Sequence, residues 1–197
     1  MSTRSGPKAS WRRAGIAPAI GMAFMASLAS ATPAVAQSAP HGIGRAPTLE
    51  EIARWDIAVG PTGDELPEGR GSAIEGRRVY EARCVTCHGA TGAEGPEDVL
   101  RGGIGSLATA NPLKTVGSYW PYATTLWDYI NRAMPFDRPT SLSNDEVYAV
   151  VAYVLFLNEI VPETHVLDRR SLLDVRMPNR DGFVPDPRPD VSPPPPP

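Results

Sequence analysis

Four stretches of the chain carry apolar residues at helical spacing and are predicted to form helices. Three of them open with a capping box, in which a Ser or Thr is followed three residues later by a Glu. The boxes are Thr48 with Glu51, Ser72 with Glu75, and Ser143 with Glu146. The four predicted helical stretches are residues 48–55, 72–84, 124–136 and 144–160.

The stretch 144–160 has the strongest helical pattern. A glycine, Gly76, stands inside the stretch 72–84, where it costs about 1 kcal/mol relative to alanine. Gly76 either permits a close crossing with the helix in 144–160 or is a tolerated surface residue. The broad apolar stripe predicted for 144–160 consists of Val147, Val150, Val151, Val154 and Leu155.

The helix in 124–136 is predicted to end before Pro135, because a proline disfavours helical geometry at the residue that precedes it. Its apolar face is predicted to consist of Leu126, Tyr129, Ile130 and Ala133.

Three long parts of the chain show no regular period apart from the helix predicted at 48–55. Residues 37–71 and 163–197 are rich in Gly, Pro and charge, and the second part ends in a run of prolines. Residues 89–122 form a long connection for a small domain, and such a connection needs something to pack against. The apolar residues available to pack against a large apolar object are Leu100, Ile104, Leu107, Val116, Tyr119 and Trp120.

The beginning of the chain has the layout of an export signal. Residues 1–13 carry basic side chains and no acidic ones, an apolar run follows, and then comes the small-residue site Ala34-Val35-Ala36. We predict a signal peptide over residues 1–36, cleaved near Ala36, and a periplasmic mature protein. An uncleaved membrane anchor is the alternative. The other predicted divisions are an N-terminal extension over 37–71, a core domain over 72–162, and a C-terminal arm over 163–197.

Cleavage would leave an acidic chain. Residues 1–36 hold four of the 19 basic residues and none of the 22 acidic ones, so the formal net charge changes from −3 to −7. A chain of this charge without a basic patch argues against nucleic-acid binding. No second apolar run is long enough to cross a bilayer, so we expect no membrane contact after cleavage.

Cys84 and Cys87 are the only cysteines, and His88 follows directly. The spacing Cys-x-x-Cys-His is the attachment signature of c-type haem. Both thiols can add to porphyrin vinyl groups, and the imidazole then lies under the iron as its proximal ligand. We predict one covalent haem c, which would also be the apolar object for 89–122. A zinc site would need further ligands, and a thioredoxin-like redox pair would need alternating strands.

The second axial ligand of the iron is predicted to be Met134, which follows a helix and comes 46 residues after His88. Met177 is the other methionine of the mature chain, and it could be the ligand only if the tail folds back over the haem. Otherwise it is a surface anchor for the tail. The remaining histidines, His41 and His165, lie in irregular segments.

A His/Met pair fills both axial positions and raises the reduction potential of the iron. Filled positions favour electron transfer over chemistry at the iron. The sequence also contains no catalytic carboxylate pair, nucleophile arrangement or phosphate loop, so we predict no catalytic centre. A vacant axial position would instead indicate a haem enzyme such as a peroxidase.

The core resembles class I cytochromes c, which implies an all-α core of three to five helices around covalent haem with long irregular extensions. The segments KTVGSYWPYATTLWDYINRAMPF, SLSNDEVYAVVAYVLFLNEIV, VRMPNRDGFVPDPRPD and TLEEIARWDIAVGPTGDELPEG are similar to the SoxD family, the cytochrome subunits of sulfane dehydrogenase. The resemblance implies attachment at Cys84 and Cys87, and axial ligation by His88 and Met134.

The same resemblance implies a molybdenum-cofactor partner subunit, SoxC, that oxidises sulfane sulfur on the carrier protein SoxYZ. Electrons would pass through the haem to a soluble cytochrome c. The extensions would either lie across the partner subunit or wrap their own core. The alternative functions are the cytochrome subunit of a sulfite dehydrogenase and a free-standing electron shuttle.

Overall fold

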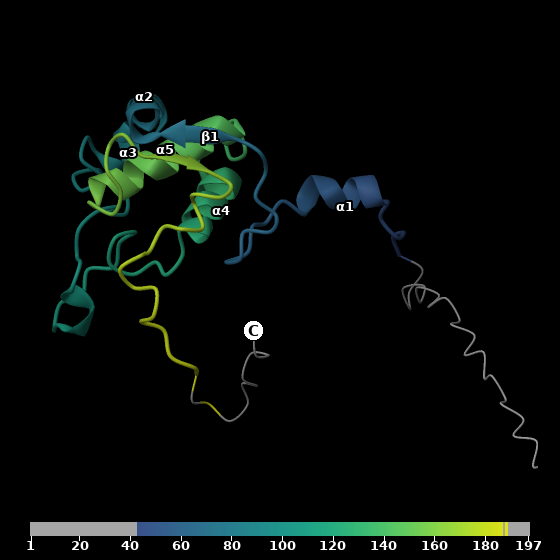
Figure 1. Ribbon diagram of the computed structural model, residues 1–197. Coiled ribbons are helices and arrows are strands. Elements are labelled where there is room, and N and C mark those ends of the chain that lie inside the picture. The colour runs from purple at the N-terminus through teal and green to yellow at the C-terminus, as the bar shows by residue number, and fades with distance from the viewer. Residues whose placement is uncertain (1–42, 187, 189–197) are drawn as a thin grey trace, which may run out of the picture. The chain divides into compact units, whose positions relative to one another are not determined.

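The computed structural model describes residues 43–186 and 188, and it is mainly helical (Figure 1). The predicted all-α class is confirmed, and each predicted helix is present. The predicted signal peptide, His41 and the final proline run lie outside the described residues. The elements are α1 Leu49–Trp55, β1 Arg70–Ser72, α2 Ala73–Arg83, α3 Val85–His88, the 3-10 helix η1 Ser106–Ala108, α4 Ala123–Ala133, α5 Asn144–Leu157 and β2 Val166–Asp168.

All three predicted capping boxes are formed, at the start of α1, α2 and α5. In each box the N-cap hydroxyl accepts the backbone N–H of the Glu three residues later, and the Glu carboxylate accepts the N-cap N–H. Each box therefore satisfies backbone donors that have no partner within the helix.

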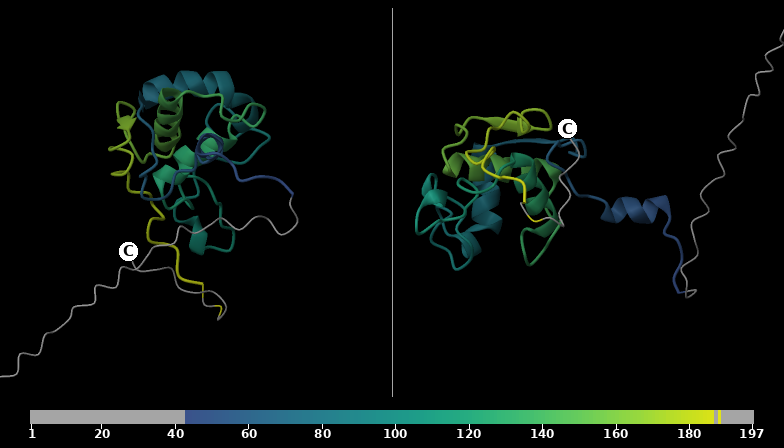
Figure 2. Two further views of the ribbon diagram at one scale, coloured as in Figure 1. Left: turned by 90° about the vertical axis from the view of Figure 1, so that its right-hand side faces the viewer. Right: turned by 90° about the horizontal axis from the view of Figure 1, so that it is seen from below.

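Helices α2 and α5 cross closely at the centre of the fold (Figures 1 and 2). A Cβ atom at Gly76 would overlap the carbonyl group of Ala149 on α5, so only glycine permits this approach. The rings of Tyr80 and Tyr153 meet beside the crossing, with centroids 5.2 Å apart. The prediction that Gly76 permits a close helix crossing is confirmed.

Helix α5 is buried on every side, because each residue from Val147 to Leu155 is buried. This is wider than the predicted stripe, since β1 and β2 also contact α5. Helix α4 differs from its predicted face, because Ala133 is only half-buried and Tyr129 is exposed, with its ring edge-on to Trp120 at 5.6 Å. The α4 residues that are buried are Ala123, Thr124, Leu126, Trp127, Asp128 and Ile130.

A short antiparallel ribbon of β1 and β2 joins the two extensions, with Gly71 opposite Leu167. The sequence pattern did not predict it, since each strand has only three residues. Both extensions also contribute buried residues to the core, so these parts wrap their own domain. The buried contributors are Val59 and Leu66 before the core domain and Leu167, Leu172, Val175 and Met177 after it.

Among the described residues, no helix combines the length and the apolar character that crossing a membrane requires.

Candidate functional site

The Cys84–His88 segment lies where α2 ends and α3 begins. Cys84 is the C-cap of α2, and its backbone N–H donates to the carbonyl of Tyr80 at 2.8 Å. Cys84 is half-buried against the hydrophobic core, whereas Cys87 on α3 is exposed, and both thiols are free. Burial, together with the nearby Cys87, raises the pKa of the Cys84 thiol to about 11.

The imidazole of His88 is oriented by the backbone. Its Nδ1 lies 2.9 Å from the carbonyl oxygen of Asp98. A carbonyl can only accept, so Nδ1 carries the proton of this bond, and in the neutral ring Nε2 is then the nitrogen with the lone pair. A metal-binding histidine is commonly held in this way, with the second ring nitrogen fixed by a backbone carbonyl. His88 is therefore prepared to bind a metal through Nε2.

The loop after His88 folds back tightly beneath the motif. The backbone N–H of Glu97 donates to the carbonyl of Cys87 at 3.0 Å, and the Tyr80 hydroxyl donates to the carbonyl of Gly89 at 2.9 Å. A Cβ atom at Gly95 would overlap the Cys87 carbonyl, so glycine is required for this approach. These contacts place the Asp98 carbonyl against the His88 ring.

Met134 is the C-cap of α4 and is half-buried against the core. Its backbone is extended, and its N–H still donates to the carbonyl of Ile130 at 3.1 Å. Met177 is only 1% exposed within the core, so the surface position considered for it is wrong. Leu172 and Val175, which precede Met177 in the sequence, are buried in the same core. His165 is half-buried in the loop before β2.

The residues present fit a large apolar prosthetic group. Cys84 and Met134 are each partly buried against the hydrophobic core, as are Val85, Leu100 and Trp120. Large apolar side chains of the same loops and of α4 are uncovered by protein. These exposed side chains are Ile104, Leu113, Tyr129 and Phe136. Free thiols, an oriented imidazole, a thioether and uncovered apolar surface together form the donor set that a covalent haem requires.

Buried polar side chains also hold the long connection, and the sequence reasoning missed them. Asn158, at the C-terminal end of α5, accepts the N–H of Gly102 at 3.0 Å and donates to the carbonyl of Leu100 at 3.1 Å. The Thr115 hydroxyl donates to the carbonyl of Gly102 at 2.6 Å. The connection 89–122 is therefore fastened by protein contacts as well as by apolar packing. An Asn directly after a strongly apolar helix was the available signal.

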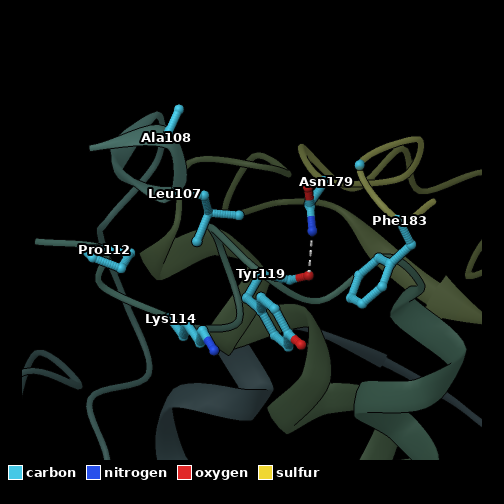
Figure 3. Close-up of a pocket in the computed structure, with 8 residues that line it drawn as sticks. Leu107, Ala108, Pro112, Lys114, Tyr119, Asn179 and Phe183 are labelled. Carbon is cyan, nitrogen blue, oxygen red and sulfur yellow. Dashed lines mark hydrogen bonds between the residues drawn. The ribbon is translucent and has the colours of Figure 1, made fainter. Parts of the chain in front are cut away.

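A cavity of about 350 Å³ lies between the connection and the C-terminal arm (Figure 3). The Asn179 side chain donates to the carbonyl of Tyr119 at 2.7 Å, and the Phe183 ring meets the Tyr119 ring at 5.3 Å. The ammonium group of Lys114 stands 5.1 Å from the centre of the Tyr119 ring. None of the four predicted haem-binding residues lines this cavity.

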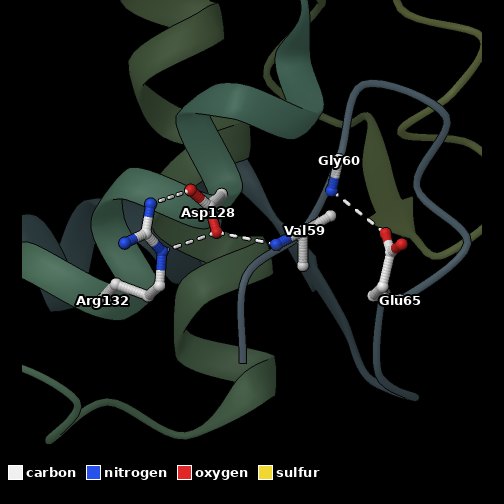
Figure 4. A network of polar contacts seen from close by, with 5 residues as sticks. All are labelled: Val59, Gly60, Glu65, Asp128 and Arg132. Carbon is white, nitrogen blue, oxygen red and sulfur yellow. Dashed lines mark hydrogen bonds and ion pairs between the residues drawn. The ribbon is translucent and has the colours of Figure 1, made fainter. Parts of the chain in front are cut away.

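Asp128 links the N-terminal extension to the helix that carries Met134 (Figure 4). Its Oδ1 accepts the backbone N–H of Val59 at 2.8 Å and the Nε–H of Arg132 at 2.8 Å. Burial would raise the pKa of this carboxyl, but the hydrogen bonds from Arg132 and Val59 outweigh burial and hold its pKa below the ordinary value. Asp128 is therefore a charged anchor within a buried contact.

No group of three or more His, Cys, Asp or Glu side chains in residues 43–186 and 188 is arranged to hold a metal ion. The zinc alternative therefore has no ligand set in this part of the chain. The helical core and the Cys84–His88 segment define a c-type cytochrome.

Comparisons with known proteins agree with this class. Residues 71–154 match the family model of cytochrome c oxidase, cbb3-type, subunit III. A chain in the crystal structure of the sulfane dehydrogenase SoxCD from Paracoccus pantotrophus is 42% identical, with a TM-score of 0.70 over 76% of this chain and 74% of that one. The chain belongs to the family of SoxD, the c-type cytochrome subunit of sulfane dehydrogenase.

A more distant relative is the thiosulfate dehydrogenase of Allochromatium vinosum, which is 30% identical over 134 residues. The match takes in 68% of this chain but only 42% of the relative, so this chain spans less than half of that protein's length.

Proposed function

We propose that the chain is a periplasmic, mono-haem electron-transfer subunit of a SoxCD-type sulfane dehydrogenase. It would accept electrons from a SoxC-like molybdenum subunit that oxidises protein-bound sulfane sulfur on SoxYZ, and it would deliver them to a soluble cytochrome c. The observation that carries the proposal is the match to the SoxCD chain at 42% identity, which covers most of both chains.

Four residues would hold the haem in this proposal. Cys84 and Cys87 would form the thioether bonds, and Nε2 of His88 and the Met134 thioether would occupy the two axial positions. When bound, haem supplies a one-electron iron couple. If His88 and Met134 both bind the iron, no position would remain for substrate, so we propose that this chain has no catalytic centre of its own.

The chain's own residues set the conditions at this site. The Asp98 carbonyl fixes the ring of His88 and makes its Nε2 a better donor. The backbone of Met134 is attached to α4 through Ile130, which limits the movement of the thioether. Leu100 and Trp120 supply apolar surface that excludes water. A His/Met pair in such surroundings suits a relatively high reduction potential.

Co-purification tests the proposal. The exported chain, tagged at its C-terminus, is isolated from the source organism, and the complex is assayed for molybdenum and for its second subunit. Its polypeptide mass is then measured after acid-acetone extraction. We expect a molybdenum subunit in stoichiometric amount and a mass increase of one haem. A mass equal to bare polypeptide would contradict covalent attachment.

Reduction kinetics separate the proposed function from its alternatives. The haem absorbance of the isolated complex is followed after addition of SoxYZ carrying sulfane sulfur, sulfite or thiosulfate. Thiosulfate is included because one relative is a thiosulfate dehydrogenase. We expect rapid reduction only with the carrier-bound sulfane sulfur. Equally rapid reduction by sulfite would support the sulfite dehydrogenase alternative, and isolation of the chain alone would support a free shuttle.

A further inference from the structure

Helix α1 makes polar contacts of its own but is not covered by the part of the chain that the structure describes. Its capping box and an ion pair between Glu50 and Arg54, at 2.5 Å, satisfy its polar groups. None of its residues is buried. Leu49 is 85% exposed and Trp55 is 87% exposed. Further along the extension, Val59 and Leu66 are buried in the core.

The exposed apolar residues of α1 lie along one face. Leu49, Ile52 and Trp55 follow one another at three-residue spacing, which places them side by side on a helix. Glu50 and Arg54, which form the ion pair, lie on the opposite side, and Glu51 lies at the edge of the apolar face beside Trp55. A continuous apolar face with large, nearly uncovered side chains is typical of a binding surface, whereas single exposed apolar residues are common and need no explanation.

The segment that follows α1 is hydrogen-bonded to the cytochrome core. Val59 is bonded to Asp128 at 2.8 Å, and the Tyr148 hydroxyl donates to the carbonyl of Pro67 at 2.9 Å. Only residues 56–58 separate α1 from the Val59 anchor. The helix is therefore tethered to the cytochrome core by a very short connection, which keeps anything bound to α1 close to the core.

The comparisons connect α1 with a protein that works in a complex. The general cytochrome family model matches only residues 71–154, so a cytochrome core does not require α1. The match to the SoxCD chain takes in 76% of this chain. Residues 50–197 are 148 of 197 residues, or 75%, so a matched span of 76% begins at or before Leu49. Helix α1 therefore lies within the span that matches the SoxCD chain.

We propose that the apolar face of α1 docks into an apolar groove on the SoxC-like subunit, an inference that rests on the proposed function above. The face formed by Leu49, Ile52 and Trp55 supplies the contact, as an amphipathic helix does in a hydrophobic groove. Residues 49–56 contain three carboxylates and one guanidinium group, a formal charge of −2, so a groove with a basic rim would complement this segment. An aromatic anchor such as Trp55 is the kind of residue that dominates binding.

A matched pair of substitutions tests the docking. Ile52→Ser is compared with Ile74→Ser, because Ile52 is 44% exposed on α1 and Ile74 is 48% exposed on α2. A second pair is Trp55→Ser and Trp55→Phe, of which the second retains an aromatic anchor. Each holoprotein is titrated against the molybdenum subunit recovered by co-purification, and the Kd is measured by calorimetry. The haem spectrum and the Tm of each variant verify folding.

We expect Ile52→Ser and Trp55→Ser to weaken binding at least tenfold, with Ile74→Ser and Trp55→Phe close to wild type and all four haem spectra unchanged. If the wild type and both Ser variants bind with the same affinity, the proposed role of α1 is overturned, but the proposed function is not. Failure of the wild type to bind would overturn the proposed function and this inference together. Sedimentation gives the last outcome. If the wild type is a homodimer, and the Ser variants lose the dimer but still bind the partner, the face binds a second copy of this chain and the inference is overturned.

Discussion

The carboxylate of Asp128 accepts the backbone N–H of Val59 at 2.8 Å, across 69 residues of sequence (Figure 4). This bond joins the N-terminal extension to α4, the helix that ends at Met134. The same carboxylate holds Arg132 one turn further along α4. The extension, the helix and the predicted axial ligand are therefore parts of one connected structure.

Removal of this carboxylate is expected to destabilise the protein. Asp128→Ala leaves the Val59 N–H buried without a partner, which costs about 1–3 kcal/mol in the free energy of unfolding. Asp128→Asn retains an oxygen for Val59 and loses only the charge opposite Arg132, so we expect a smaller loss. Denaturant unfolding of the holoprotein measures both. The anchor would be unimportant if the Ala variant unfolded at the same midpoint as wild type.

The lowered pKa of Asp128 also makes the stability of the protein depend on pH. The pKa of Asp128 is lowered in the folded state, so its contribution is present above the unfolded pKa, about 3.9, and is lost as pH falls through the folded value. The difference in unfolding free energy between wild type and Asp128→Asn should therefore be constant from about pH 7 to 5. It should shrink below about pH 4. Unfolding midpoints of both proteins from neutral to acidic pH check this, and a difference that persists or grows in acid would contradict it.

Much of the helical framework could be predicted because local chemistry determines it. Ser72 with Glu75 and Ser143 with Glu146 mark helix starts by satisfying nearby backbone donors, and the structure has both. Gly76 was informative because a glycine within a helix has a cost that a close crossing explains.

What could not be predicted depends on contacts between distant parts of the chain. Met177 stands in a polar, Pro-rich segment, and only the packing of the C-terminal arm buries it. The carbonyl that orients His88 belongs to Asp98, whose side chain has no part in the bond, so residue identity carried no signal. Val59 likewise contributes its N–H to Asp128 through the backbone.

Substitution of Gly76 by alanine is expected to disrupt the α2–α5 crossing. The new Cβ atom would overlap the backbone carbonyl of Ala149, which cannot move without shifting α5. Overpacking of this kind costs about 1–3 kcal/mol or more. Gly60→Ala is the control, because its Cβ would lie 3.6 Å from the Glu65 carboxylate, an ordinary contact. Thermal unfolding of both variants measures the effect, and equal Tm values would disprove the steric argument.

Met134 and Met177 are expected to respond in opposite ways to alanine substitution. Met134→Ala should abolish the long-wavelength sulfur–iron charge-transfer band and lower the reduction potential, because it removes the predicted axial thioether. Met177 is 1% exposed in the core, so Met177→Ala should keep the band. It should instead cost about 2–5 kcal/mol in unfolding free energy through the cavity that it leaves. Absorption spectra, redox titration and unfolding of the two holoproteins provide the comparison. Survival of the band in Met134→Ala together with its loss in Met177→Ala would transfer the ligand assignment to Met177, and the C-terminal arm would then have to place that thioether at the iron.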